Sequence, residues 1–117
     1  MKCVRCLIAD IPQQLLADIV QNIAKESGLI EVVDQVSSVA DIPAVIANKP
    51  VDVLILGMKN TELPSLCVDL MNRISHLLVI GLVDDGRRLA VYLNNVGRTD
   101  ILRIIRTLGI LNKERTF

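Results

Sequence analysis

Val51-Asp-Val-Leu-Ile-Leu56 is an apolar run closed by Gly57, and it is typical of a strand that is buried on both faces of a sheet. A helical pattern lies on each side of it in the chain. Residues 41–49 begin at Asp41, which can cap a helix, and residues 66–74 carry apolar side chains at helical spacing. A buried strand between two amphipathic helices indicates a parallel sheet with crossover helices.

The same alternation extends toward the N-terminus. Residues 3–9 form a nearly continuous apolar run, residues 12–27 have a helical pattern, and residues 29–36 are short and rich in β-branched side chains. Three strand–helix units in succession predict right-handed crossovers, with helices on both faces of the sheet.

The pattern changes in the last third of the chain. Residues 77–83 predict a fourth strand, but only Asp84-Asp-Gly-Arg87 separates it from a second extended run at residues 88–93. Four residues cannot carry a parallel crossover, which needs roughly a dozen, whereas an Asp-Gly pair is a strong hairpin signal. We therefore expect an antiparallel fifth strand with no helix before it. A final helix is expected at residues 99–108 and a frayed tail at residues 112–117.

Length and composition limit the classes of protein. The chain has 117 residues, which is natural for one domain, and we expect residues 1–117 to form it. Thirteen basic and thirteen acidic residues cancel, so the general attraction to nucleic acid or anionic lipid is missing. The N-terminus matches neither a signal peptide nor a membrane span. We expect a cytoplasmic protein with reduced thiols.

Three segments resemble the receiver domain of bacterial response regulators, the phosphoryl-accepting module of two-component systems. They are Cys6-Leu-Ile-Ala-Asp10, Ile30-Glu-Val-Val-Asp-Gln-Val36 and Lys49-Pro-Val-Asp-Val-Leu-Ile-Leu56, and the similarity covers about residues 3–82. The resemblance implies a three-layer, flavodoxin-like α/β sandwich with strand order 2-1-3-4-5. It places the functional site at the carboxyl ends of the first and third strands, and it implies a role in signal transduction or transcriptional regulation.

The residues that the family uses for chemistry are mostly replaced. Receivers hold Mg²⁺ with acids after the first strand, attack a phosphoryl donor with an aspartate after the third, and add a hydroxyl and a lysine. Here Asp10 matches one acid, but Ile11 stands at the second acid, Gly57 at the nucleophile and Leu82 at the hydroxyl. The fifth strand ends at Leu93-Asn94-Asn95, where the resemblance expects a lysine. The resemblance therefore implies a degenerate phosphorylation pocket without catalytic residues, metal or cofactor.

The leading hypothesis is a non-catalytic, phosphorylation-independent pseudo-receiver that acts by contact with a protein partner or a second copy of itself. A sheet edge leaves backbone groups unpaired and invites another strand. The expected interaction surface combines that edge with the following helix: Arg88, Val91, Tyr92, Leu93, Arg103 and Arg106. Acidic residues lie among these arginines, which favours a solvated face over a nucleic-acid site. A membrane partner is not expected.

Two alternatives stay open. One is a small-molecule sensor that binds a nucleotide or metabolite in the crevice near Asp10, Gly57 and Met58, where glycine in place of an acid leaves room and removes charge. The other is a true receiver whose phosphoryl acceptor is relocated to Asp52 or to Asp10.

The cysteines and the one histidine are expected to be structural. Cys3 and Cys6 match a C-x-x-C motif, but residues three apart on a strand point to opposite faces, so they are poorly placed to share a metal. We expect these thiols, and Cys67 in a helix, to be buried and inert. His76 is expected at the surface, on the side of the sheet away from the crevice.

Overall fold

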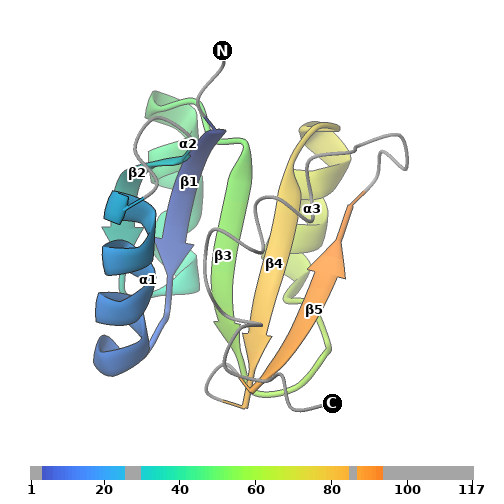
Figure 1. Cartoon of the computed structure of the whole chain (residues 1–117). Helices are drawn as coiled ribbons and strands as arrows, with labels where there is room; N and C mark the ends of the chain where they lie inside the picture. Colours follow the sequence, from blue (N-terminus) through green and yellow to red (C-terminus); the bar gives the residue numbers. More distant parts are fainter. Residues whose placement is uncertain (1–3, 26–29, 85–86, 94–117) are drawn as a thin grey trace.

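The computed structural model describes residues 4–25, 30–84 and 87–93. These residues form a mixed five-stranded β-sheet and the helices that pack against it. In chain order the elements are β1 (Val4–Ala9), α1 (Gln13–Lys25), β2 (Ile30–Val36), the 3-10 turn η1 (Val39–Asp41), α2 (Ile42–Asn48), β3 (Val53–Met58), α3 (Ser65–Arg73), β4 (Leu78–Val83) and β5 (Arg88–Tyr92). The strand order is β2-β1-β3-β4-β5 (Figure 1). The first four strands are parallel and β5 is antiparallel to β4, so the predicted α/β class, strand order and antiparallel fifth strand are confirmed.

Helices cover both faces of the sheet. Residues alternate between the two sides of a strand, so β1 sends Cys6 and Ile8 toward α1 and sends Leu7 toward α2 and α3. In Figure 1, α1 lies on one side of the sheet and α2 and α3 lie on the other. The core is built almost wholly from aliphatic side chains, because the strands β1, β3 and β4 are enclosed on both faces.

The boundaries of β3 differ from the predicted ones. The strand begins at Val53 instead of Val51, and it continues through Gly57 to Met58. Gly57 pairs with Leu82 in β4, so the expectation that this glycine closes the strand is wrong. Glycine usually weakens a strand, and its presence inside one commonly marks a close approach of another backbone.

Some predictions lie outside the described residues. They include Cys3, the helix at 99–108 with Arg103 and Arg106, and the tail at 112–117. Within the described ranges, no helix is long and apolar enough to cross a bilayer.

Candidate functional site

The carboxyl ends of β1 and β3 meet at a turn that fills much of the predicted pocket. Asp10 has a φ of 53°, in the left-handed region that aspartate tolerates better than most residues. Its backbone N–H donates to the Val36 carbonyl at 3.0 Å. A Cβ added to Gly57 would lie 2.0 Å from the Asp10 carbonyl oxygen. The interpretation that Gly57 leaves room for a ligand is therefore wrong, because the main chain of Asp10 occupies that space.

A small hollow remains beside this turn. It measures about 170 Å³, and its walls come from the ends of β1 and β3, from the start of α1 and from β4: Asp10, Pro12, Leu15, Gly57, Met58, Lys59 and Leu82. Small-molecule sites usually measure about 300–1,000 Å³. The structure therefore brings Asp10, Gly57 and Leu82 together as predicted. Ile11 instead packs against the apolar cluster under α1.

Asp52 lies at the opposite end of β3 from this hollow. Its carboxylate accepts a hydrogen bond from the Arg5 backbone N–H at 3.0 Å, and its own N–H donates to the Arg5 carbonyl at 2.8 Å. The Asp52 carbonyl accepts from the Leu78 N–H at 3.1 Å. The His76 side chain is 62% exposed and places its Nε2 atom 3.6 Å from the Asp52 carboxylate. Asp52 thus joins β1, β3 and β4, and it shares no site with Asp10.

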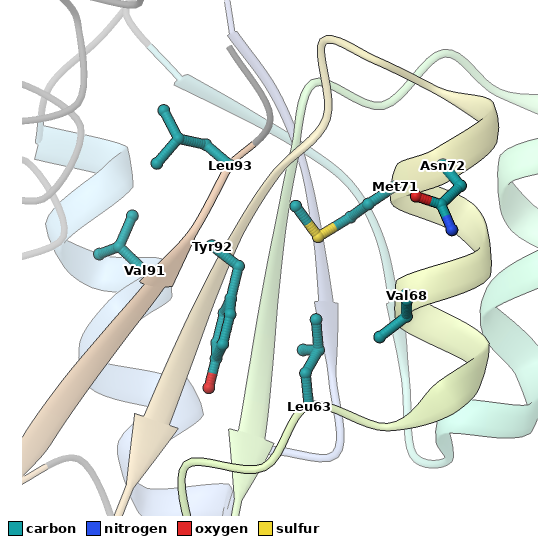
Figure 2. A pocket seen from close by; sticks show the side chains of 7 residues that line it. All are labelled: Leu63, Val68, Met71, Asn72, Val91, Tyr92 and Leu93. Carbon is teal, nitrogen blue, oxygen red and sulfur yellow. The ribbon is translucent and has the colours of Figure 1, made fainter. Parts of the chain in front are cut away.

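A larger apolar groove opens between α3 and β5. It measures about 390 Å³ and is lined by side chains from the loop before α3, from α3 and from β5: Leu63, Val68, Met71, Asn72, Val91, Tyr92 and Leu93. Figure 2 shows Val68 and Met71 pointing from α3 toward the strands, with Leu63 between α3 and Tyr92. The Tyr92 hydroxyl donates to the Thr61 carbonyl, which holds the ring across the groove.

The groove follows from the short hairpin. Because only residues 84–87 join β4 to β5, no helix from that connection covers this face of the two strands. Val68 is 42% exposed, and among the described residues it is the one large hydrophobic residue that is exposed to solvent. A single exposed apolar side chain is normal, but Val68 lies at an apolar groove, and an apolar patch of that kind is typical of a binding surface.

The sequence indicated the β5 side of the groove but not the α3 side. Val91, Tyr92 and Leu93 were expected on an interaction surface, but the α3 side was not. The sequence feature that could have indicated the α3 side is Val68, an apolar residue of α3 that is not one of its buried residues. Arg88 does not line the groove, and its side chain donates to Asp84 at 2.9 Å.

A scan against protein-family models and searches of curated proteins and of solved structures return no match for this chain.

The two described cysteines are buried free thiols. Cys6 is 1% exposed in the core under α1, and Cys67 is fully buried on the other face of the sheet. Burial raises the pKa of the Cys6 thiol to about 12 and also raises the pKa of Cys67. A thiolate is the reactive form of cysteine, so both residues are chemically inert in the fold.

The raised pKa of Cys6 predicts how stability depends on pH. In the unfolded chain this thiol ionises near its ordinary value of 9.0, and in the fold near 12. Between those values the unfolded chain has released a proton that the folded chain keeps. The free energy of unfolding should therefore fall as pH rises above 9 and should be unaffected by this thiol below 9. Urea denaturation at about pH 8 and about pH 10 measures the fall. The Cys6→Ala variant should show a shallower one, and an equal slope in both proteins would contradict the assignment.

Proposed function

We propose that the chain is a flavodoxin-like pseudo-receiver that acts in signal transduction or transcriptional regulation by binding another protein chain, without phosphorylation. The observation that carries the proposal is the apolar groove between α3 and β5, where Val68 is exposed beside the end strand of the described sheet. A groove of this kind beside a strand edge offers both an apolar contact and backbone hydrogen bonds to a partner.

The pocket at the strand ends supports the part of the proposal that excludes phosphoryl transfer. A receiver needs an aspartate side chain where Gly57 stands, and the Asp10 carbonyl oxygen lies only 2.0 Å from the position of its Cβ. The turn at Asp10 and the glycine at 57 are thus matched to each other. A fold that packs its own backbone into the acceptor position is adapted to a function other than phosphoryl transfer.

The small-molecule alternative has less support from the geometry. The hollow of about 170 Å³ beside Asp10 is smaller than most ligand sites, and its one described cation is Lys59. The contact function therefore remains the better explanation of the described surface.

A photocrosslinking amino acid at Val68 tests the contact function in cells that express the full chain. Because Val68 projects from α3 at the groove, we expect a crosslinked product whose mass exceeds the chain by that of a protein, either a partner or a second copy. The matched control carries the same amino acid at Gln21, an exposed residue of α1. Equal crosslinking at both positions, or none at Val68, would remove the groove from the function.

A further inference from the structure

The sheet has two outer strands, and they differ in how their edges are protected. In the described structure β2 lies at one end of the sheet and β5 at the other. An exposed strand edge is a template for pairing with another chain unless charges, prolines or bulges block it.

The β2 edge is blocked. The pairing of β1 with β2 passes from Val32 to Asp34, so Val33 is a bulge residue. The Lys49 ammonium group donates to the Val33 carbonyl at 3.1 Å and contacts the Asp34 carboxylate at 3.4 Å. Hydrogen bonds from the Gln35 backbone and from Lys49 hold the pKa of Asp34 below its ordinary value, so this carboxylate stays charged. A bulge, a lysine and an acid all disfavour a further strand here.

Among the described residues, the β5 edge has none of these features. Residues 88–93 (Arg-Leu-Ala-Val-Tyr-Leu) contain no proline, no lysine and no acid, and the one charge, on Arg88, is paired with Asp84 of the same chain. The partner of Ala90 in β4 is Gly81, and the Ala90 carbonyl oxygen lies 3.6 Å from a Cβ placed on Gly81, so this carbonyl points toward β4. Because inward and outward backbone groups alternate, Leu89 and Val91 direct their N–H and C=O groups away from β4.

We propose that β5 pairs antiparallel with β5 of a second copy of this chain, about a two-fold axis at Ala90. This proposal rests on the function proposed above and names the partner. In this register Leu89 of each copy faces Val91 of the other copy, which gives two equivalent pairs. The two residues of each pair exchange backbone hydrogen bonds. An axis at Leu89 or at Val91 would instead need Arg87 or Leu93, which lie outside β5, to complete the pairing.

The side chains suit this register. Ala90 meets Ala90 of the second copy in a non-hydrogen-bonded pair, where backbones approach to about 4.5 Å and a small side chain fits best. Arg88 faces Tyr92 of the other copy on the α3 side, which allows a guanidinium to lie against the aromatic ring. Leu89 and Val91 form an apolar cross-strand pair on the opposite side. The chain has no net charge, so two copies do not repel each other.

The strand pair is short compared with a standard interface of about 1,600 Å². The dimer is therefore expected to dissociate on dilution. Sedimentation velocity of the full chain over a range of concentrations should show a monomer converting to a dimer. A chain that stays monomeric up to about millimolar concentration, where even weak contacts are populated, would overturn the proposal.

Charged residues introduced at Ala90, on the two-fold axis, test the register. Ala90→Lys and Ala90→Glu each place like charges opposite each other, so each variant alone should be monomeric, whereas an equal mixture should restore the dimer as a one-to-one complex. Circular dichroism of each variant checks that the fold is retained. A dimer that survives in either variant alone would show that the copies meet elsewhere.

A cysteine at the axis gives a second measurement that does not depend on the strength of the dimer. In a Cys3→Ser background, Ala90→Cys should form an inter-chain disulfide on mild oxidation, because facing positions in such a pair lie within disulfide reach. The matched control is Arg88→Cys, on the same side of the same strand, which faces Tyr92 and should not crosslink to itself. Crosslinking of both variants to the same extent would reject this register.

The two proposals fail separately. If Val68 crosslinks to a different protein while the chain is monomeric at all concentrations, the contact function stands and self-pairing is rejected. If the chain dimerises through Ala90 but Val68 gives no protein adduct, self-pairing stands and the groove is not the contact surface.

Discussion

Replacing Gly57 by alanine should lower the free energy of unfolding by about 3 kcal/mol, the upper end of the usual cost of overpacking, because the neighbouring atoms belong to the main chain. The added methyl group would stand 2.0 Å from the carbonyl oxygen and 3.0 Å from the carbonyl carbon of Asp10. Both atoms belong to a main chain that is fixed by the hydrogen bond from Asp10 to Val36. The clash can be relieved only by moving the β1–α1 turn. Urea denaturation followed by circular dichroism measures the loss.

Gly81→Ala is the matched control. Gly81 lies in β4, and a methyl group there would meet the Met58 sulfur at 2.4 Å. That atom is near the end of a flexible side chain that can turn aside, so the cost should be below about 1.5 kcal/mol. Equal losses in the two variants would mean that the Asp10 turn gives way as easily as a methionine side chain, and the account of the filled pocket would be wrong.

The same geometry predicts the result of an attempt to introduce the chemistry of a receiver domain. Gly57→Asp places an aspartate where the resemblance to receivers expects the phosphoryl acceptor, but its Cβ makes the same contact with Asp10 as the alanine does. The variant should be at least as unstable as Gly57→Ala, and incubation with acetyl phosphate and Mg²⁺ should leave its intact mass unchanged. A stable variant that gains one phosphoryl group would show that the pocket needs only one substitution to function.

These contacts also mark the limit of what could be predicted from the sequence. The alternation of strands and helices and the hairpin were predictable because apolar periodicity and an Asp-Gly turn are local signals. The strand order was expected only from the resemblance to receiver domains. The role of Gly57 was not, because it depends on the backbone of Asp10, which is distant in the sequence and lies in the left-handed region. The sequence shows a glycine where receivers carry an acid, and the expectation that this glycine leaves an empty space is wrong.

The groove shows a related limit. The sequence indicated that β5 is an outer strand, but it did not indicate which face of β5 would lack a covering helix. That answer needs the position of α3, which places Val68 and Met71 opposite Tyr92. The short hairpin and the exposed Val68 are separate local features, and only their position in three dimensions makes them one surface.

Replacing Asp52 by alanine should lower the free energy of unfolding by about 1–3 kcal/mol, the usual cost of leaving a partly buried donor without its acceptor. The Asp52 carboxylate accepts the Arg5 N–H at 3.0 Å, at the point where β1 and β3 come together. Asp52→Asn keeps a side-chain oxygen that can accept it and should lose less, which separates the hydrogen bond from the charge. Urea denaturation of both variants measures the difference.

His76→Ala is the control for the ion pair. The His76 Nε2 atom lies 3.6 Å from the carboxylate and its side chain is mostly exposed, so its loss should cost less than about 1 kcal/mol. A large effect of His76→Ala with a small effect of Asp52→Ala would reverse the assignment. Asp52 was also the candidate for a relocated phosphoryl acceptor, and the same proteins decide that question. A carboxylate used to join β1 to β3 should take up no phosphoryl group from acetyl phosphate, and a phosphorylated Asp52 in the wild-type chain would make its role catalytic instead of structural.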